Sequence, residues 1–125
     1  MIDVKVTTRK SFDKVKAKAQ QGNFKSLIQV NTDLPVYIDR AIDLACHEGY
    51  PGHHVYNALL EKTLVKDRGW IEYTVYPLFS PQSLIAEGTA NYGIDVAFPL
   101  PARLTFERDV LFPLAGDRKS TRLNS

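Results

Sequence analysis

Apolar and polar side chains alternate briefly over residues 26–31, and their β-forming types predict a short strand. A helix is predicted directly afterwards, because Asp33 is a capping residue and Pro35 is an early proline. Four apolar residues then recur at helical spacing and define one buried face: Ile38, Ala41, Ile42 and Ala45. At about 100° per residue, His47 projects from the opposite face of this helix.

A break follows at residues 50–52, because Pro51 has no backbone N–H to donate and Gly52 adds conformational freedom. Helical spacing returns over residues 55–64 and is expected to end at Gly69. Residues 71–75 fit either a strand or a short helix, and both alternatives stay open.

Ser80 and Pro81 predict the start of another helix, with a hydroxyl cap and a proline at the first position. This helix runs through Glu87 to Phe98, and a last helix follows over residues 102–112. The fold class is therefore mainly α, with one short strand before the helix that carries His47. Four aromatic residues between the helices are expected to fill the core: Trp70, Tyr73, Tyr76 and Phe79.

The composition, 125 residues with 44% hydrophobic and 24% charged, fits one ordinary globular domain. The single cysteine excludes an internal disulfide and a Cys-rich zinc ribbon, so any metal must be held by histidine and carboxylate. No apolar run approaches the roughly 18 residues of a membrane span, and no signal-peptide stretch follows Met1. The default expectation is a cytoplasmic protein without a membrane partner.

Charge is unevenly distributed along the chain. Residues 1–25 carry seven Lys and Arg against two Asp, whereas residues 26–116 carry six basic against eleven acidic residues. We interpret residues 1–22 as a basic, loosely structured segment, residues 23–116 as the core, and residues 117–125 as a non-native tail without hydrophobic periodicity. No nucleic-acid-binding motif accompanies the basic residues, so nucleic acid is not expected as a partner.

All three histidines lie in the segment HEGYPGHH, residues 47–54. On an unbroken helix, His47 and His53 would lie about 240° apart around the axis, and His47 and His54 about 10 Å apart along it. Neither pair could then share a zinc ion with bonds of about 2.0–2.1 Å. Looping out residues 51–52 leaves the order H-E-x-x-H, in which Glu48 has the place of a general base.

This spacing makes His47 and His53 the better ligand pair, while His54 stays open as the alternative ligand or as a group that supports the transition state. A catalytic zinc site needs at least one further ligand. Glu87 is the candidate, because it lies on a separate helix and is followed by small residues that allow close helix approach. Asn91, one turn further on, is a candidate for orienting it.

Other side chains near the motif have two interpretations each. Asp43 lies one turn before His47 and is a candidate acceptor for its second ring N–H. Tyr50 and Tyr92 either stabilise an oxyanion or pack at helix junctions. Cys46 is either a thiolate ligand or, as an isolated cysteine near an apolar helix face, a small buried residue.

From about residue 22 to residue 116, the chain resembles a widespread bacterial family, domain of unknown function 885. The resemblance rests on HEGYPGHH and on EGTANY, which match the family signature HExxPGHH plus a later EGxA. That family resembles gluzincin zinc metallopeptidases. Because its members are much longer, the resemblance implies that this chain is a fragment of such a helical catalytic core. The strand near Ile28 to Asn31 would resemble the edge strand that holds an extended substrate.

The resemblance further implies Zn²⁺ held by His47, His53 and Glu87, with Glu48 as the base that activates water. The expected function is a zinc-dependent hydrolase acting on peptides or on other small amides or esters. Two alternatives stay open: a metal-binding module without catalysis, and a metal-free helical interaction domain.

Overall fold

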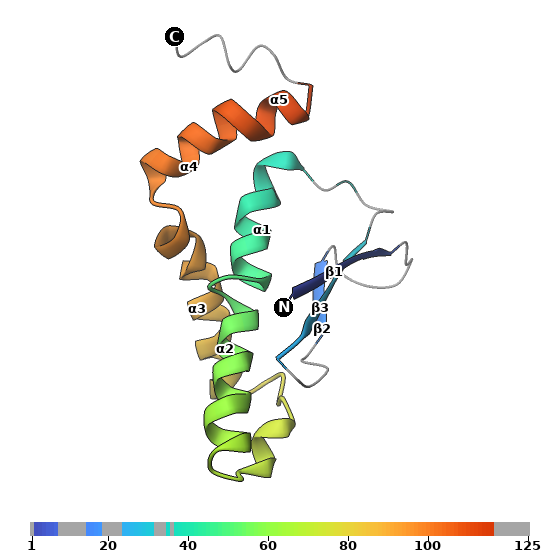
Figure 1. The fold of residues 1–125 in the computed structure, drawn as a ribbon, viewed down its shortest axis with the longest axis vertical. Helices are drawn as coiled ribbons and strands as arrows, with labels where there is room; N and C mark the ends of the chain where they lie inside the picture. The colour runs from blue at the N-terminus through green and yellow to red at the C-terminus, as the bar shows by residue number, and fades with distance from the viewer. Residues whose placement is uncertain (1, 8–14, 19–23, 32–34, 36, 117–125) are drawn as a thin grey trace.

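A computed structural model describes residues 2–7, 15–18, 24–31, 35 and 37–116, and it is mainly helical, as the sequence predicts (Figure 1). The strands are β1 (Ile2–Thr7), β2 (Val15–Lys18) and β3 (Ser26–Asn31). The α-helices are α1 (Ala41–Glu48), α2 (His53–Leu60), α3 (Pro81–Ala97), α4 (Leu100–Phe106) and α5 (Phe112–Leu114). Short 3-10 turns span Ile38–Arg40 and Ile71–Thr74, and π-helical segments extend α2 and α4 over Glu61–Lys66 and Glu107–Leu111. In the described part of the chain, no helix has the length and apolar character of a membrane span.

The predicted strand, β3, is the centre of a three-stranded sheet with the order β1-β3-β2. It pairs in parallel with β1, where Val4 lies opposite Ile28, and antiparallel with β2, where Ala17 lies opposite Ile28. The expectation that this strand is an edge that holds substrate is therefore wrong. Both of its hydrogen-bonding edges are already occupied by strands of the same chain.

The two outer strands lie within residues 1–22, the segment that the sequence analysis interprets as loosely structured. β1 and β2 occupy residues 2–7 and 15–18, the part of that segment that the structure describes. The sequence contains a pattern that indicates β1, because Ile2, Val4 and Val6 alternate with polar residues at the period of a strand.

Helix α1 begins later than the sequence suggested, after the 3-10 turn Ile38–Arg40, and residues 32–34 of the expected start lie outside the described residues. Its buried apolar side chains are Ile42 and Cys46, whereas Ile38 and Ala45 are exposed. The buried face of α1 is thus rotated relative to the predicted one, because Ile42 and Cys46 pack against Ile94 of α3 and against Leu111. Cys46 is thus a core residue.

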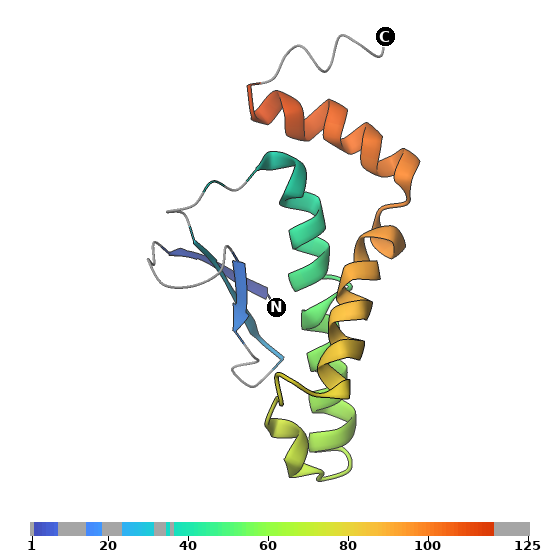
Figure 2. The same ribbon diagram turned by 180° about the vertical axis from the view of Figure 1, so that it is seen from behind.

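Helix α3 begins where the sequence predicts it. Ser80 caps it by accepting a hydrogen bond from the Ser83 N–H at 3.3 Å, and Pro81 is its first residue. Its buried face consists mainly of small residues, and α3 runs alongside α1 and α2 when the molecule is viewed from either side (Figures 1 and 2). At Gly93, a Cβ would lie 3.2 Å from the Cys46 carbonyl oxygen, so the backbones of α1 and α3 approach closely there.

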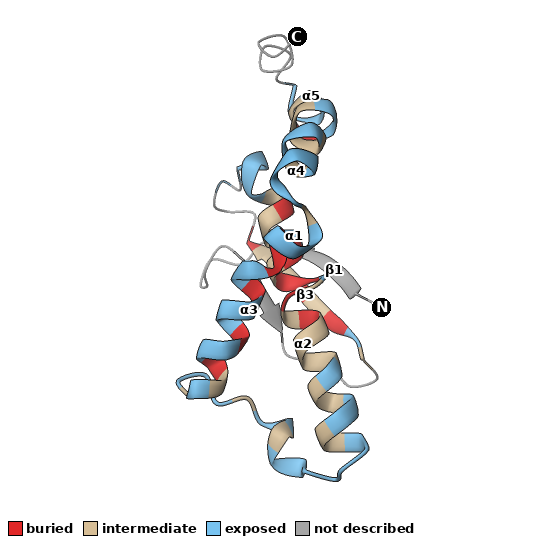
Figure 3. Ribbon diagram, turned by 90° about the vertical axis from the view of Figure 1, so that its left-hand side faces the viewer, coloured by how far each residue is buried: buried red, intermediate tan, exposed pale blue. Residues whose placement is uncertain are grey.

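Buried residues concentrate where α1, α3 and β3 meet (Figure 3). The segment between α2 and α3 lies away from this region, and the expectation that its aromatic residues fill the core is wrong for two of them: Trp70 is 42% exposed and Phe79 is 98% exposed. Tyr73 and Tyr76 are half-buried. Residues 71–74 form a 3-10 turn, which settles the choice between strand and helix, and Gly69 has the positive φ of 71° expected of a helix stop.

Candidate metal centre

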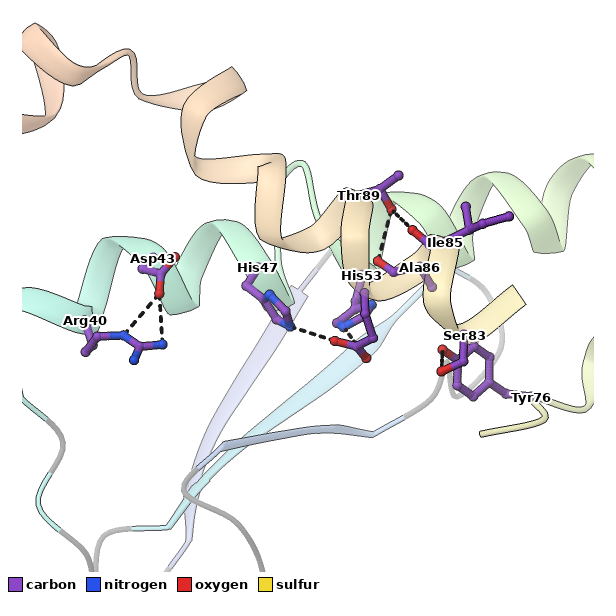
Figure 4. Close-up of polar contacts among 10 residues, drawn as sticks. Arg40, Asp43, His47, His53, Tyr76, Ser83, Ile85, Ala86 and Thr89 are labelled. Atoms are coloured by element: carbon purple, nitrogen blue, oxygen red, sulfur yellow. Dashed lines mark hydrogen bonds and ion pairs between the residues drawn. The ribbon is translucent and has the colours of Figure 1, made fainter. Parts of the chain in front are cut away.

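Three helices bring one potential ligand each to a common point. His47 lies near the end of α1, His53 is the first residue of α2, and Glu87 lies in the middle of α3. One ligand atom from each residue lies within 4.8 Å of the others. In Figure 4, His47 and His53 point toward each other from their two helices. The group could hold a metal ion.

The separations within this group resemble those between the ligands of one ion. His47 Nε2 lies 3.5 Å from Glu87 Oε2, and His53 Nε2 lies 3.3 Å from Glu87 Oε1. Both distances exceed the 2.7–3.2 Å typical of N–H···O hydrogen bonds. They are close to the roughly 3.3 Å that separates two ligand atoms about 2.0–2.1 Å from a tetrahedral zinc ion. Two imidazoles and a carboxylate are also a ligand set that catalytic zinc sites use.

The break at residues 49–52 makes this convergence possible. The Gly49 N–H still donates to the Ala45 carbonyl at 2.9 Å, but the Gly52 N–H reaches back six residues to the Cys46 carbonyl, also at 2.9 Å. The intervening residues are looped out, and α2 restarts with His53 beside His47, with ring centroids 4.7 Å apart and planes at 89°. The structure thus contains the interruption at Pro51 and Gly52 that the sequence predicts.

Only glycine fits at position 52. A Cβ there would lie 1.9 Å from the His47 carbonyl oxygen and 2.4 Å from that of Cys46. We expect Gly52→Ala to lower the free energy of unfolding by about 3 kcal/mol or more, at the upper end of overpacking effects, because backbone atoms have to move. Urea denaturation measures this change.

Gly88→Ala is the matched control for Gly52→Ala. A Cβ at Gly88 would meet nothing within 4 Å, and this glycine lies inside α3. Alanine should be neutral there or stabilise the protein by up to about 1 kcal/mol, as expected inside a helix. Equal effects of the two substitutions would contradict the close approach at Gly52.

Glu48 is a buried carboxylate next to the three-residue group. It is 8% exposed, and its Oε2 atom has no hydrogen-bond partner among the described residues. Burial raises the pKa of the Glu48 carboxyl, the charge of Glu87 raises it further, and His47 opposes the change. In the sequence Glu48 directly follows His47, a member of the three-residue group.

His54 points away from the group, toward the sheet. Its Nδ1 atom forms a 2.8 Å hydrogen bond with Ser26 Oγ of β3, and its ring lies 5.0 Å from that of Tyr50. Burial lowers the pKa of both His53 and His54, although the charge of Glu87 opposes this for His53. Of the two adjacent histidines, His53 therefore lies with His47 and Glu87, and His54 does not.

Among the described residues, none of the other candidates forms a hydrogen bond or ion pair with this group. Asp43 pairs with Arg40, with a 3.1 Å hydrogen bond from Nε to Oδ2, rather than with His47. Asn91 and Tyr92 are exposed on α3, and within the described part of the chain neither forms a hydrogen bond with Glu87. Tyr50 is exposed, and its ring lies 5.0 Å from that of His54.

Helix α3 is held in place one turn before Glu87. The Tyr76 hydroxyl donates to Ser83 Oγ at 3.0 Å, and Ser83 lies on the buried face of the helix (Figure 4). On the other side of Glu87, the Thr89 hydroxyl donates to the Ile85 and Ala86 carbonyls at 2.9 and 3.0 Å. These contacts secure the backbone that presents the carboxylate.

Ser26 is the residue near the site that sequence reasoning missed. Its partner His54 is 28 residues away, so no local spacing connects the two. The feature that could have indicated a role for Ser26 is its position in the strand. Ser26 and Ile28 share one face of β3, and both are buried, so a polar residue at this position needs a hydrogen-bond partner.

Comparisons with family models, with curated proteins and with solved structures find no match to this chain. The two features of the chain that bear on its function are therefore the convergence of His47, His53 and Glu87 and the burial of Glu48, the residue after His47.

Proposed function

We propose that the protein is a zinc-dependent hydrolase that cleaves peptide bonds. The observation that carries the proposal is the convergence of His47, His53 and Glu87 from three helices, at separations suited to the ligands of one ion. The resemblance of HEGYPGHH and EGTANY to the signature of family 885, and through it to gluzincin metallopeptidases, supports the same chemistry.

The roles of the residues follow from their places. His47, His53 and Glu87 would hold Zn²⁺, which when bound lowers the pKa of a coordinated water to about 7 and polarises a carbonyl group. Glu48 follows a ligand histidine directly, and its buried Oε2 has no hydrogen-bond partner among the described residues. It takes the proton from the attacking water and delivers it to the leaving amine, the work of a general base and then a general acid.

The first test is the metal content of the purified protein. We expect about one equivalent of zinc per chain, as in a mononuclear catalytic site, and none in His47→Ala. A chelator should remove the metal together with any hydrolysis of a mixed peptide substrate, and added Zn²⁺ should restore both. A folded wild-type protein without stoichiometric metal would contradict the proposal and favour the metal-free helical domain.

A further inference from the structure

The third histidine of the HEGYPGHH segment, His54, has no place in the proposed metal site, although it is among the most buried polar residues in the described part of the chain. His54 is 3% exposed and its hydrogen-bond partner Ser26 is 5% exposed. Their 2.8 Å contact joins the first turn of α2 to the first residue of β3. A buried pair of this kind is costly to break, because either partner alone would be left unsatisfied.

His53 and His54 start the same helix but point in different directions. Successive residues of a helix project about 100° apart, and here His53 lies beside Glu87 while His54 lies against Ser26. Any rotation of the first turn of α2 that breaks one of these contacts also displaces the other. The orientation of His53 is therefore coupled to the hydrogen bond of its neighbour.

The start of α2 is held through the backbone of the break, where the Gly52 N–H donates to the Cys46 carbonyl at 2.9 Å. The break at residues 49–52 separates it from α1, and Gly52 provides no side-chain cap for its N-terminus. The backbone contact that follows the break is the 3.1 Å hydrogen bond from the Tyr56 N–H to the Gly52 carbonyl. The hydrogen bond between His54 and Ser26 adds a side-chain attachment of this turn to the sheet, which the backbone contacts of the break do not provide.

Ser26 is a firm point of attachment. It belongs to the central strand, where it lies opposite Ile2 of β1. A second contact joins the same two elements further along: Lys66, in the π-helical extension of α2, lies 4.0 Å above the Phe24 ring, just before β3, and pairs with Glu61 at 3.0 Å. The helical segment that carries His53 is thus docked on the start of β3 at two places.

We propose that Ser26 and His54 are positioning residues for the metal ligand His53, with the hydrogen bond between them setting the rotation of α2 that aligns the His53 imidazole. This inference rests on the proposed function, because it requires that His47, His53 and Glu87 bind a metal. It goes beyond that function because it makes the zinc affinity of the protein depend on Ser26, a strand residue that is not one of the potential metal ligands.

The experiment compares Ser26→Ala with wild type. Zinc affinity is measured by competition with a chromophoric chelator, and ligand geometry by the visible absorption of bound Co²⁺. We expect Ser26→Ala to bind zinc about 10-fold more weakly, the lower end of the effects of residues that support ligands, and to change the Co²⁺ spectrum. Since the substitution removes one hydroxyl oxygen, the protein keeps its packing at β3.

Two His54 variants separate hydrogen bonding from bulk. His54→Asn keeps a polar side-chain atom at the position of Nδ1 and should retain most of the affinity and the Co²⁺ spectrum, whereas His54→Leu should lose at least as much affinity as Ser26→Ala. Leu111→Ala is the control for general destabilisation, because Leu111 lies in the core cluster and not in the group of potential ligands. It should lower stability and leave zinc affinity unchanged.

The outcomes distinguish the two proposals. If wild type binds zinc and Ser26→Ala binds it equally well with the same Co²⁺ spectrum, the positioning role is wrong and the metal site stands. An equal loss of affinity in Leu111→Ala would also overturn positioning, since any loss of stability would then suffice. If wild type binds no zinc, both proposals fall.

Discussion

His53→Ala is expected to weaken zinc binding by more than about 100-fold, because losing a direct ligand should exceed the 10- to 100-fold effect of losing a residue that only supports one. The substitution leaves His47 and Glu87 as the remaining pair of the group. Two protein ligands fall short of the three that catalytic zinc sites use. Isothermal titration with Zn²⁺, or the metal content after dialysis, measures the loss.

His54→Ala is the matched comparison, since it changes the next residue in the same turn of α2. It should weaken zinc binding only about 10-fold, as expected for a supporting residue. We expect the opposite order for the stability of the metal-free protein. His54→Ala leaves buried Ser26 without its partner, at a cost of about 1–3 kcal/mol, whereas His53→Ala removes a longer, 3.3 Å contact with Glu87, whose side chain is 49% exposed. Thermal unfolding in the presence of a chelator measures the stability of the two metal-free variants.

The zinc affinities and the metal-free stabilities of these two variants together test the assignment of His53, and not His54, as the metal ligand. If His54→Ala abolished zinc binding and His53→Ala spared it, the ligand pair would be His47 and His54, and the hydrogen bond to Ser26 would have to break on metal binding. If neither variant affected zinc, the group formed with Glu87 would not be the metal site.

The features that the sequence predicted well depend on neighbouring residues. Ser80 and Pro81 start α3 because a cap and a first-turn proline act within one turn of helix. The interruption at Pro51 and Gly52 follows from the missing N–H of proline and from the lack of a Cβ at residue 52. Because this break was predictable, the pairing of His47 with His53 was predictable too.

The features that the sequence analysis missed depend on distant contacts. The central place of β3 required knowledge of its pairing with β1 and β2, which the single strand pattern of residues 26–31 does not contain. The exposure of Trp70 and Phe79 depends on where their segment lies relative to the other helices, and residue type alone favoured burial. Ser26 and His54 are coupled across 28 residues for the same reason.

Glu48→Gln is expected to reduce peptide hydrolysis by about 10²- to 10⁴-fold while zinc stays bound, because glutamine keeps the shape of the side chain and cannot take the proton. Glu48 is not a member of the group formed by His47, His53 and Glu87, so zinc content should equal that of wild type. Glu61→Gln is the control, since Glu61 is the other described residue with a buried carboxylate oxygen that has no hydrogen-bond partner, and it pairs with Lys66 instead of lying beside the metal ligands. Hydrolysis that survives Glu48→Gln with zinc retained would reject Glu48 as the base and favour a metal-binding module without catalysis.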